Sequence, residues 1–315
     1  MGTITYMNDQ QRRTLAHLCP QVRWNVSMAS YSTFRTGGLV EALVEIESVA
    51  MLPALLRWLK EQQVRWHVVG GGSNILVRSG AHPGVCIRLR DTVRSAQIKS
   101  CQESSSTGLL VTVGAGCSLP AFVGWCAGKG LQGLEFMAGI PGSVGGAIRM
   151  NAGAFGHAVF EQLHAIQCVT GEGEVVEVAH GEVFFRYRES RFPGEPAQRL
   201  VITGGTFILA PGSREQLQAR IRELVLQRQR KQPAGAASAG SFFKNPEGDY
   251  AGRLIEQAGL KGLMRGKAMV SPVHANFIVN TGGAAPEDIL ELMREVRERV
   301  LEQTGILLEP EVHIL

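Results

Sequence analysis

The chain has 315 residues, of which 44% are hydrophobic and 19% are charged, a composition typical of a globular protein with a sizeable core and two or three domains. Its 32 lysines and arginines are nearly balanced by 28 aspartates and glutamates, so the composition does not indicate a large polyanion as a partner. No stretch approaches the length of a membrane span, and the N-terminal sequence MGTITYMNDQQRRT lacks the apolar run of a signal peptide.

The cysteines show no CxxC pair and no spacing typical of a zinc site. They are Cys19, Cys86, Cys101, Cys117, Cys126 and Cys168. Reduced thiols are therefore expected, as in a cytoplasmic protein. The N-terminus also fails the myristoylation pattern, because Tyr6 stands where a serine or threonine is required. Together these features predict a cytoplasmic protein.

The first predicted domain, residues 1–97, has a β-α-β pattern with a glycine-rich turn at a strand end. Residues 42–48 (ALVEIES) are typical of a strand, and leucines at helical spacing follow over residues 52–59. Residues 66–76 (WHVVGGGSNIL) predict a β-branched strand that enters three consecutive glycines. The next strand is predicted at residues 85–89 (VCIRL).

The second predicted domain, residues 98–212, is rich in strands. Residues 109–119 (LLVTVGAGCSL) again run a strand into a glycine turn, and a helical segment follows to about Lys129. Residues 163–179 read as a β-hairpin with a glycine-containing turn, and residues 199–210 as a closing strand.

The third predicted domain, residues 213–315, begins with an amphipathic helix that Pro233 ends. A short helix closed by Gly259 at its C′ position follows, and then a strand over residues 274–280. Pro286 opens a charged amphipathic helix.

Glycine-rich stretches mark the candidate binding loops. GGGSN (70–74), GAGCS (114–118) and GIPGSVGG (139–146) each combine glycines with small residues. Backbone N–H groups in such turns can surround an anion, and side chains would block its approach. The spacing matches neither GxGxxG nor the Walker motif, so neither of those mechanisms is implied. From the residues alone, phosphate binding and plain tight turns both stay open.

YRESRF (187–192) and SAGSFFKNP (238–246) contain polar side chains suited to chemistry. Arg188 lies either in a solvated charged turn or aims its guanidinium at a carboxylate or phosphate. Ser241 has small neighbours and no GxSxG elbow around it, so a hydrolase nucleophile is not indicated. A proton-donating serine and an ordinary surface serine both stay open.

LEPEV (308–312) places Glu309 and Glu311 two residues apart near the C-terminus. In a strand, such positions point to the same side. Nothing local makes this carboxylate pair catalytic.

Eight motifs, taken in order, resemble those of the UDP-N-acetylenolpyruvoylglucosamine reductase family of flavoenzymes, in its short, type II form. They are TFRTGG (33–38), GGGSNIL (70–76), GLEFMAGIPGSVGGAIRMNAGAFG (133–156), YRESRF (187–192), GSFFKNP (240–246), AGRLIEQAGLKG (251–262), HANFIVN (274–280) and LEPEV (308–312). The resemblance implies two α+β FAD-binding subdomains of the vanillyl-alcohol-oxidase (PCMH) type, at 1–97 and 98–212, and a smaller α+β substrate-binding domain at 213–315.

The reaction implied by the resemblance has two halves. NADPH reduces FAD, and the reduced flavin passes hydride to UDP-N-acetylglucosamine enolpyruvate to give UDP-N-acetylmuramate for peptidoglycan synthesis. A related flavin oxidase that uses oxygen is the alternative, and a non-catalytic nucleotide-binding regulator is a third possibility. In such proteins the flavin performs the redox step while the protein supplies geometry and electrostatics.

The resemblance also implies roles for individual residues. Arg188 and Glu311 would flank the charged intermediate, and Ser241 would donate a proton to its carbanion carbon. Lys231, Asn245 and, less closely matched, Lys244 would contact the nucleotide diphosphate. FAD would be held without a covalent bond by Arg35, Gly70, Gly71, Gly72, Ser73, Asn74, Gly114, Gly116, Gly139, Gly142, Ser143, Gly145 and Gly146.

One departure distinguishes the short form. Only residues 247–250 separate FFKNP from AGRLIEQAG, which leaves no room for the loop that closes a tyrosine over UDP in the longer form. What covers the nucleotide is therefore open. His274 is a candidate for contact with it, although a histidine bound to backbone is the alternative.

Overall fold

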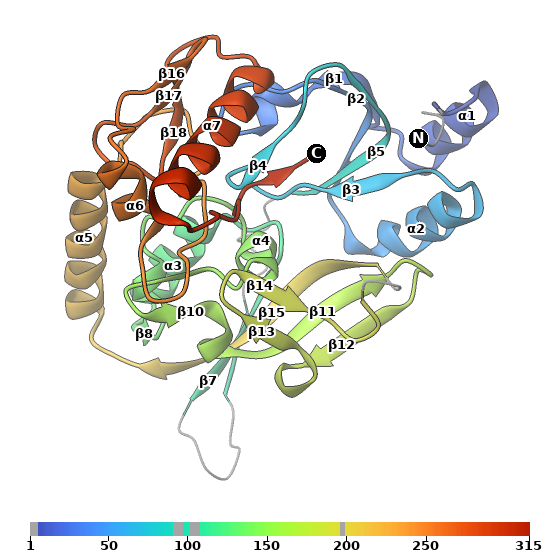
Figure 1. Cartoon of the computed structure of the whole chain (residues 1–315). Coiled ribbons are helices and arrows are strands. Elements are labelled where there is room, and N and C mark those ends of the chain that lie inside the picture. Colours follow the sequence, from blue (N-terminus) through green and yellow to red (C-terminus); the bar gives the residue numbers. More distant parts are fainter. Residues whose placement is uncertain (1–5, 91–96, 101–107, 196–198) are drawn as a thin grey trace. The chain divides into compact units, whose positions relative to one another are not determined.

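The computed structural model describes residues 6–90, 97–100, 108–195 and 199–315 (Figure 1). Contacts divide the chain into two compact units. The first unit comprises Met1–Trp24, Glu41–Gly71 and Pro83–Val225, and the second comprises Asn25–Val40, Gly72–His82 and Leu226–Leu315. The division of the chain at residues 97 and 212 stays a prediction.

A four-stranded sheet of order β1-β2-β5-β3 has most of its residues in the first unit. Its elements in chain order are α1 (Asp9–Leu18), β1 (Arg23–Ser27), β2 (Leu39–Ile46), α2 (Leu52–Glu61), β3 (Trp66–Val68) and β5 (Ala81–Leu89). Strands β3 and β5 are parallel, and the segment that joins them, residues 69–80, contains no helix. The predicted strand at 42–48, helix at 52–59 and strand at 85–89 are thus confirmed.

The second sheet of the first unit is antiparallel, with order β12-β11-β15-β7-β6 and β8 paired to one end of β15. Its strands and helices are β6 (Gln97–Ser100), β7 (Leu109–Gly114), α3 (Leu119–Gly128), β8 (Leu131–Gln132), α4 (Val144–Arg149), β11 (Leu163–Thr170), β12 (Val175–Ala179) and β15 (Leu200–Pro211). Two small hairpins, β9 (Gly153–Ala154) with β10 (His157–Ala158) and β13 (Phe184–Arg186) with β14 (Glu189–Arg191), accompany it. The predicted hairpin at 163–179 is confirmed as β11–β12.

Buried side chains connect the two sheets of the first unit. Leu52 and Leu55 of α2 belong to the same apolar cluster as Val169 of β11 and Val201 of β15. A second cluster packs α3 and α4 against β7, β11 and β15. The shared cluster explains why both sheets lie in one compact unit.

The second unit is built around the three-stranded antiparallel sheet β16-β17-β18. Its elements are β4 (Ile75–Leu76), α6 (Ala251–Gln257), β16 (Met264–Arg265), β17 (Ala268–Val270), β18 (Ile278–Asn280), α7 (Pro286–Thr304) and β19 (His313–Ile314), and β19 pairs in parallel with β4. Phe34, Phe242 and Phe243 are buried with α6 and α7 in its core. Helix α5 (Arg214–Lys231) begins in the first unit and ends in the second.

The termini of the last two helices follow the sequence rules. Helix α7 starts at Pro286 and ends at Gly305, whose φ is +72°, and Gly259, with φ +70°, follows α6. One expectation was wrong in part, because only residues 278–280 of the predicted strand 274–280 are a strand. In LEPEV, Pro310 forms a single bridge with Phe243.

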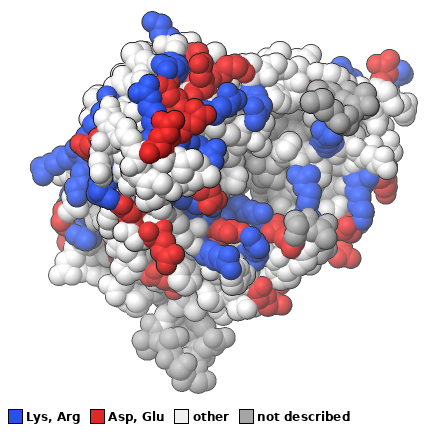
Figure 2. Space-filling view, viewed as in Figure 1, with Lys and Arg blue, Asp and Glu red and all other residues white. Residues whose placement is uncertain are grey.

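Surface charge is mixed, as the balanced composition predicts. On the face shown in Figure 2, acidic and basic side chains lie beside each other over α7, where Glu295 forms ion pairs with Arg265 and Arg299. Among the described helices, none combines the length and apolarity that crossing a membrane requires. The described cysteines are free and buried, and Cys101 lies outside the described residues.

Candidate active site

Two glycine-rich loops of the first unit touch through their backbones. A Cβ added to Gly71 would lie 2.6 Å from the Cα of Gly142, and one added to Gly70 would lie 2.3 Å from the Oγ of Ser143. Real Cβ atoms do not approach other atoms so closely. The glycines after β3 therefore allow this loop to pack on the loop before α4.

The third glycine-rich loop, which follows β7, packs on the same stretch before α4. Gly145 N donates to Ala115 O at 2.8 Å, and a Cβ on Gly145 would lie 2.7 Å from the Cβ of Ala115. Val144 N donates to Cys117 O at 2.9 Å. A Cβ on Gly116 would lie 2.2 Å from the carbonyl oxygen of Arg90. The first unit thus brings together Gly70, Gly71 and the predicted FAD-binding residues from Gly114 to Gly146.

Part of this loop cluster presents bare backbone to solvent. Gly71, Gly139 and Gly146 are exposed. The φ angles of Gly139 and Gly142 are +75° and +117°, which favour glycine. Ser143 caps α4, because its Oγ accepts from Gly146 N at 3.3 Å. An exposed surface without side chains fits the close approach of a dinucleotide such as FAD.

The remaining predicted FAD-binding residues belong to the second unit. Gly72 has a φ of +67°, and a Cβ there would lie 1.8 Å from Tyr31 O. Asn74 donates from Nδ2 to Glu311 O at 3.1 Å, so its amide holds the C-terminal segment. Ser73 is half-buried, and Arg35 is exposed with a left-handed φ of +55°. The predicted set is therefore divided between the two units.

Arg188 occupies the turn of the β13–β14 hairpin in the first unit. Its φ is +58°, an uncommon conformation for a residue with a side chain. The half-buried guanidinium donates from Nη1 to Gly153 O at 2.9 Å and lies 5.4 Å from the ring centroid of Tyr187. Within YRESRF, Arg191 and Glu189 form an ion pair at 2.5 Å. Arg188 contacts the backbone of Gly153 and the ring of Tyr187.

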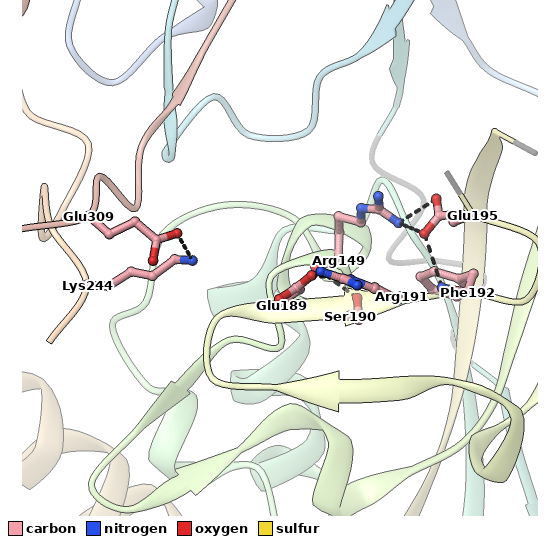
Figure 3. A network of polar contacts seen from close by, with 8 residues as sticks. All are labelled: Arg149, Glu189, Ser190, Arg191, Phe192, Glu195, Lys244 and Glu309. Carbon is pink, nitrogen blue, oxygen red and sulfur yellow. Dashed lines mark hydrogen bonds and ion pairs between the residues drawn. The ribbon is translucent and has the colours of Figure 1, made fainter. Parts of the chain in front are cut away.

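Two buried polar side chains fix this hairpin to the first unit. Ser190 donates to the carbonyl oxygen of Arg149 at 2.8 Å, and Asn151 donates from Nδ2 to Arg186 O at 2.9 Å. Figure 3 shows Ser190 beside Arg149, whose guanidinium forms two 2.8 Å hydrogen bonds with the carboxylate of Glu195. Both residues lie inside the quoted motifs, but neither was predicted to anchor the hairpin. Ser190 stands between the charged residues Glu189 and Arg191, so no local sequence signal identifies it as buried.

Ser241 and Glu311 lie on paired segments of the second unit. Glu311 N donates to Phe242 O at 2.8 Å, and Lys244 N donates to Glu309 O at 2.8 Å. The side chains of Lys244 and Glu309 also form an ion pair at 2.6 Å, which Figure 3 displays. Ser241 and Glu311 are both half-buried. Backbone pairing therefore brings these two predicted catalytic residues to neighbouring positions.

The predicted nucleotide contacts have local partners in the second unit. Asn245 accepts at Oδ1 from Ala251 N at 3.1 Å, at the start of α6. Lys244 pairs with Glu309. Lys231 is exposed at the end of α5, where a cation complements the helix dipole.

His274 is half-buried at the start of the HANFIVN motif. Its Nδ1 lies 3.2 Å from Asn276 N and accepts a hydrogen bond from it. Burial, and then the positive charge of Lys261, lower the pKa of His274 below 6.5. A neutral ring bound to backbone is what this environment favours.

Comparisons with known proteins show similarity along nearly the whole chain. Residues 232–315 match the family "UDP-N-acetylenolpyruvoylglucosamine reductase, C-terminal domain", and residues 40–179 match "FAD binding domain". The UDP-N-acetylenolpyruvoylglucosamine reductase of Desulfosudis oleivorans is 40% identical over 303 residues, which cover 94% of this chain and 95% of that protein. The one from Alkalilimnicola ehrlichii is 42% identical over 289 residues, 91% and 92% of the two chains.

A solved structure is similar as well. The crystal structure of the UDP-N-acetylenolpyruvylglucosamine reductase from Thermus caldophilus matches with a TM-score of 0.75 at 35% identity. The match covers 92% of this chain and 97% of that one. Together with the FAD-binding match, it confirms the predicted fold class, an α+β FAD-binding fold followed by a smaller α+β domain.

Proposed function

Because the chain belongs to the UDP-N-acetylenolpyruvoylglucosamine reductase family, we propose that it reduces UDP-N-acetylglucosamine enolpyruvate to UDP-N-acetylmuramate, with NADPH as the hydride donor. It is a flavin-dependent oxidoreductase, and FAD is its cofactor. The observation that carries the proposal is similarity along more than nine-tenths of the chain to proteins named as this reductase. These relatives favour the reductase over the oxidase alternative. A place in cytoplasmic peptidoglycan synthesis belongs to the same proposal.

FAD, when bound, supplies the two-electron chemistry that carries hydride from NADPH to the enolpyruvyl group. The glycine-rich loops of this chain and Arg35 would bind FAD. The exposed backbone at Gly71, Gly139 and Gly146 supports this assignment, because no side chain there would hold a flat or phosphorylated group away.

Three residues are assigned to the substrate. Hydride addition to the enol-ether CH2 leaves negative charge on the adjacent carbon, delocalised into the carboxylate. Arg188 would stabilise this charge as a permanent cation. Glu311 would act as a neutral or proton-sharing partner, because an ionised carboxylate beside the developing charge would repel it. Ser241 would donate the proton that completes the product.

Nucleotide recognition is assigned to the second unit. Lys231, Asn245 and Lys244 would contact the diphosphate, and the short connection at residues 247–250 leaves no room for the loop that closes a tyrosine over UDP in the longer form. The exposure of Lys231 and Asn245 is consistent with contact to a charged ligand.

The test separates the two half-reactions. The purified FAD-loaded protein is reduced anaerobically with one equivalent of NADPH, UDP-N-acetylglucosamine enolpyruvate is added, and the visible absorbance of the flavin is followed. We expect rapid return of the oxidised spectrum and formation of UDP-N-acetylmuramate. A flavin that stays reduced until air is admitted would support the oxidase and overturn the proposed substrate.

Ser241→Ala provides the matched test of the proposed proton donor. We expect flavin oxidation by the substrate to slow by about 10²-fold or more, the lower range for loss of a general acid. Flavin reduction by NADPH is expected to keep its rate. Equal damage to both half-reactions would count against the assignment of Ser241.

A further inference from the structure

The side chain of Asn276 is bound on both sides to the backbone of Phe243. Phe243 N donates to Asn276 Oδ1 at 3.0 Å, and Asn276 Nδ2 donates to Phe243 O at 2.8 Å. In addition, Phe242 N donates to the main-chain oxygen of Asn276 at 2.7 Å. Asn276 is only 3% exposed. One buried asparagine thus fixes the two residues that follow Ser241.

Residues on either side of Ser241 show why this contact matters for its placement. Gly240, just before it, adopts a left-handed φ of +78° and has no side chain to hold it in place. Phe242 and Phe243, just after it, are 0% and 1% exposed. The two residues directly after Ser241 are therefore firmly placed, and this is the side on which Asn276 binds.

The same contact also affects the position of Glu311, the other half-buried residue of the second unit that is assigned to the substrate. Phe242 O accepts from Glu311 N at 2.8 Å, so a shift of Phe242 would also shift the backbone of Glu311. The ion pair between Lys244 and Glu309 holds these segments together less strongly than the hydrogen bonds of Asn276, because the Glu309 side chain is 70% exposed and water competes for such pairs. Hydrogen bonds of a fully buried amide have no such competition.

Asn276 is itself held by a tight turn. Ser271 Oγ accepts from Val273 N at 3.2 Å and from His274 N at 3.3 Å, and Ser271 N donates to Phe277 O at 2.8 Å. His274 Nδ1 accepts from Asn276 N. The turn explains why the motif does not begin as a strand. It orients the Asn276 amide toward the segment that carries Ser241.

We propose that Asn276 is a positioning residue for the reaction, which fixes the main chain of Phe242 and Phe243 and thereby the Ser241 hydroxyl and Glu311. This rests on the proposed function, in which Ser241 donates a proton to the substrate. Asn276 contacts the backbone of the segment and acts through it.

Asn276→Asp is the sharpest variant, because it keeps the shape of the side chain. An ionised aspartate still accepts from Phe243 N but has no proton to donate to Phe243 O, whereas a protonated aspartate can donate it. Burial favours the protonated form. We expect flavin oxidation by UDP-N-acetylglucosamine enolpyruvate to slow by roughly 10²-fold at neutral pH, as for a small misplacement of a catalytic group. Flavin reduction by NADPH is expected to be unchanged.

A pH series supplies a readout that general destabilisation would not produce. Relative to the unmodified protein, oxidation of reduced Asn276→Asp by the substrate is expected to recover as the pH falls from about 8 to about 5.5, where a buried carboxyl gains its proton. The rate of flavin reduction by NADPH in the variant, relative to the unmodified protein, should not change with pH. Val296→Ala is the control, since it truncates a buried side chain of α7 in the same unit. Equal slowing in Val296→Ala, or no recovery at low pH, would overturn the proposal.

Backbone hydrogen exchange tests the contact without relying on activity. In Asn276→Ala, the backbone amides of residues 238–245 are expected to exchange faster than in Val296→Ala at matched stability. Equal exchange in the two variants would overturn the proposal even if the reductase activity is established. Conversely, an unmodified protein that fails to oxidise its flavin with the substrate would refute the proposed function, and with it the role in positioning Ser241, whatever the exchange shows.

Discussion

Gly71→Ala adds one methyl group where the structure leaves no room for it. The new Cβ would lie 2.6 Å from the Cα of Gly142, a backbone atom that cannot rotate away as a side chain can. The φ of Gly71 is not in the left-handed region, so the cost comes from crowding and not from backbone conformation. Overpacking of this kind costs about 1–3 kcal/mol. At roughly 2–4 °C per kcal/mol for a unit of this size, the midpoint of thermal unfolding should fall by about 2–12 °C.

Gly124→Ala makes the same chemical change at an exposed position of α3, where nothing lies within 4 Å of the added Cβ. In a helix interior this change stabilises by about 0.5–1 kcal/mol. The midpoint of thermal unfolding is expected to fall in Gly71→Ala and to rise in Gly124→Ala. The flavin content, measured by visible absorbance, is expected to fall only in Gly71→Ala. If Gly71→Ala unfolds at the unmodified temperature with full flavin content, the two loops can separate at no cost and the packing argument is wrong.

Four further changes test other parts of the structure. Glu41→Ala should lower the free energy of unfolding by about 2–5 kcal/mol in urea titrations, because its buried carboxylate accepts from two buried backbone N–H groups. Burial lowers the pKa of His274, so the unfolded chain binds more protons than the folded one and stability falls as the pH drops below about 6.5. His274→Gln should flatten this decline in thermal scans. Arg188→Lys should slow flavin oxidation by the substrate nearly as much as Arg188→Ala, because lysine lacks the planar fork. Gly146→Ala should raise stability slightly, since its Cβ would meet only Ser143 Oγ at 3.4 Å and alanine favours a helix, but it should weaken FAD binding in fluorescence titrations.

Elements with strong local signals could be predicted from the sequence. Helix α7 has Pro286 at its start and Gly305 at its end, and the leucines of α2 repeat at helical spacing. In the β11–β12 hairpin, two β-rich segments lie on either side of a glycine-containing turn. The predicted strand at residues 274–280 was too long, because the hydroxyl of Ser271 holds a turn there. Side-chain-to-backbone hydrogen bonds of this kind compete with a strand and leave little trace in hydrophobic periodicity.

Contacts between distant segments could not be predicted from local patterns. Residues 25–40 and 72–82 join the C-terminal residues in the second unit, through the pairing of β4 with β19 and the hydrogen bond from Asn280 Nδ2 to Phe34 O. Ser241 and Glu311 are likewise neighbours only because their segments pair. The motif resemblance named both residues, but it gave no reason for their placement, and it left the amide of Asn276 unnoticed.

The glycine-rich loops show why the two interpretations of their sequence could not be separated. Gly70, Gly71 and Gly145 are explained by loop packing alone, since a Cβ at each would overlap a neighbouring loop. Gly146 is different, because it is exposed within α4 and its Cβ would meet nothing closer than 3.4 Å. A glycine there costs helix stability without a packing benefit. The phosphate interpretation therefore depends most on Gly146, whereas the tight-turn interpretation accounts for most of its neighbours, and one glycine-rich sequence serves both purposes.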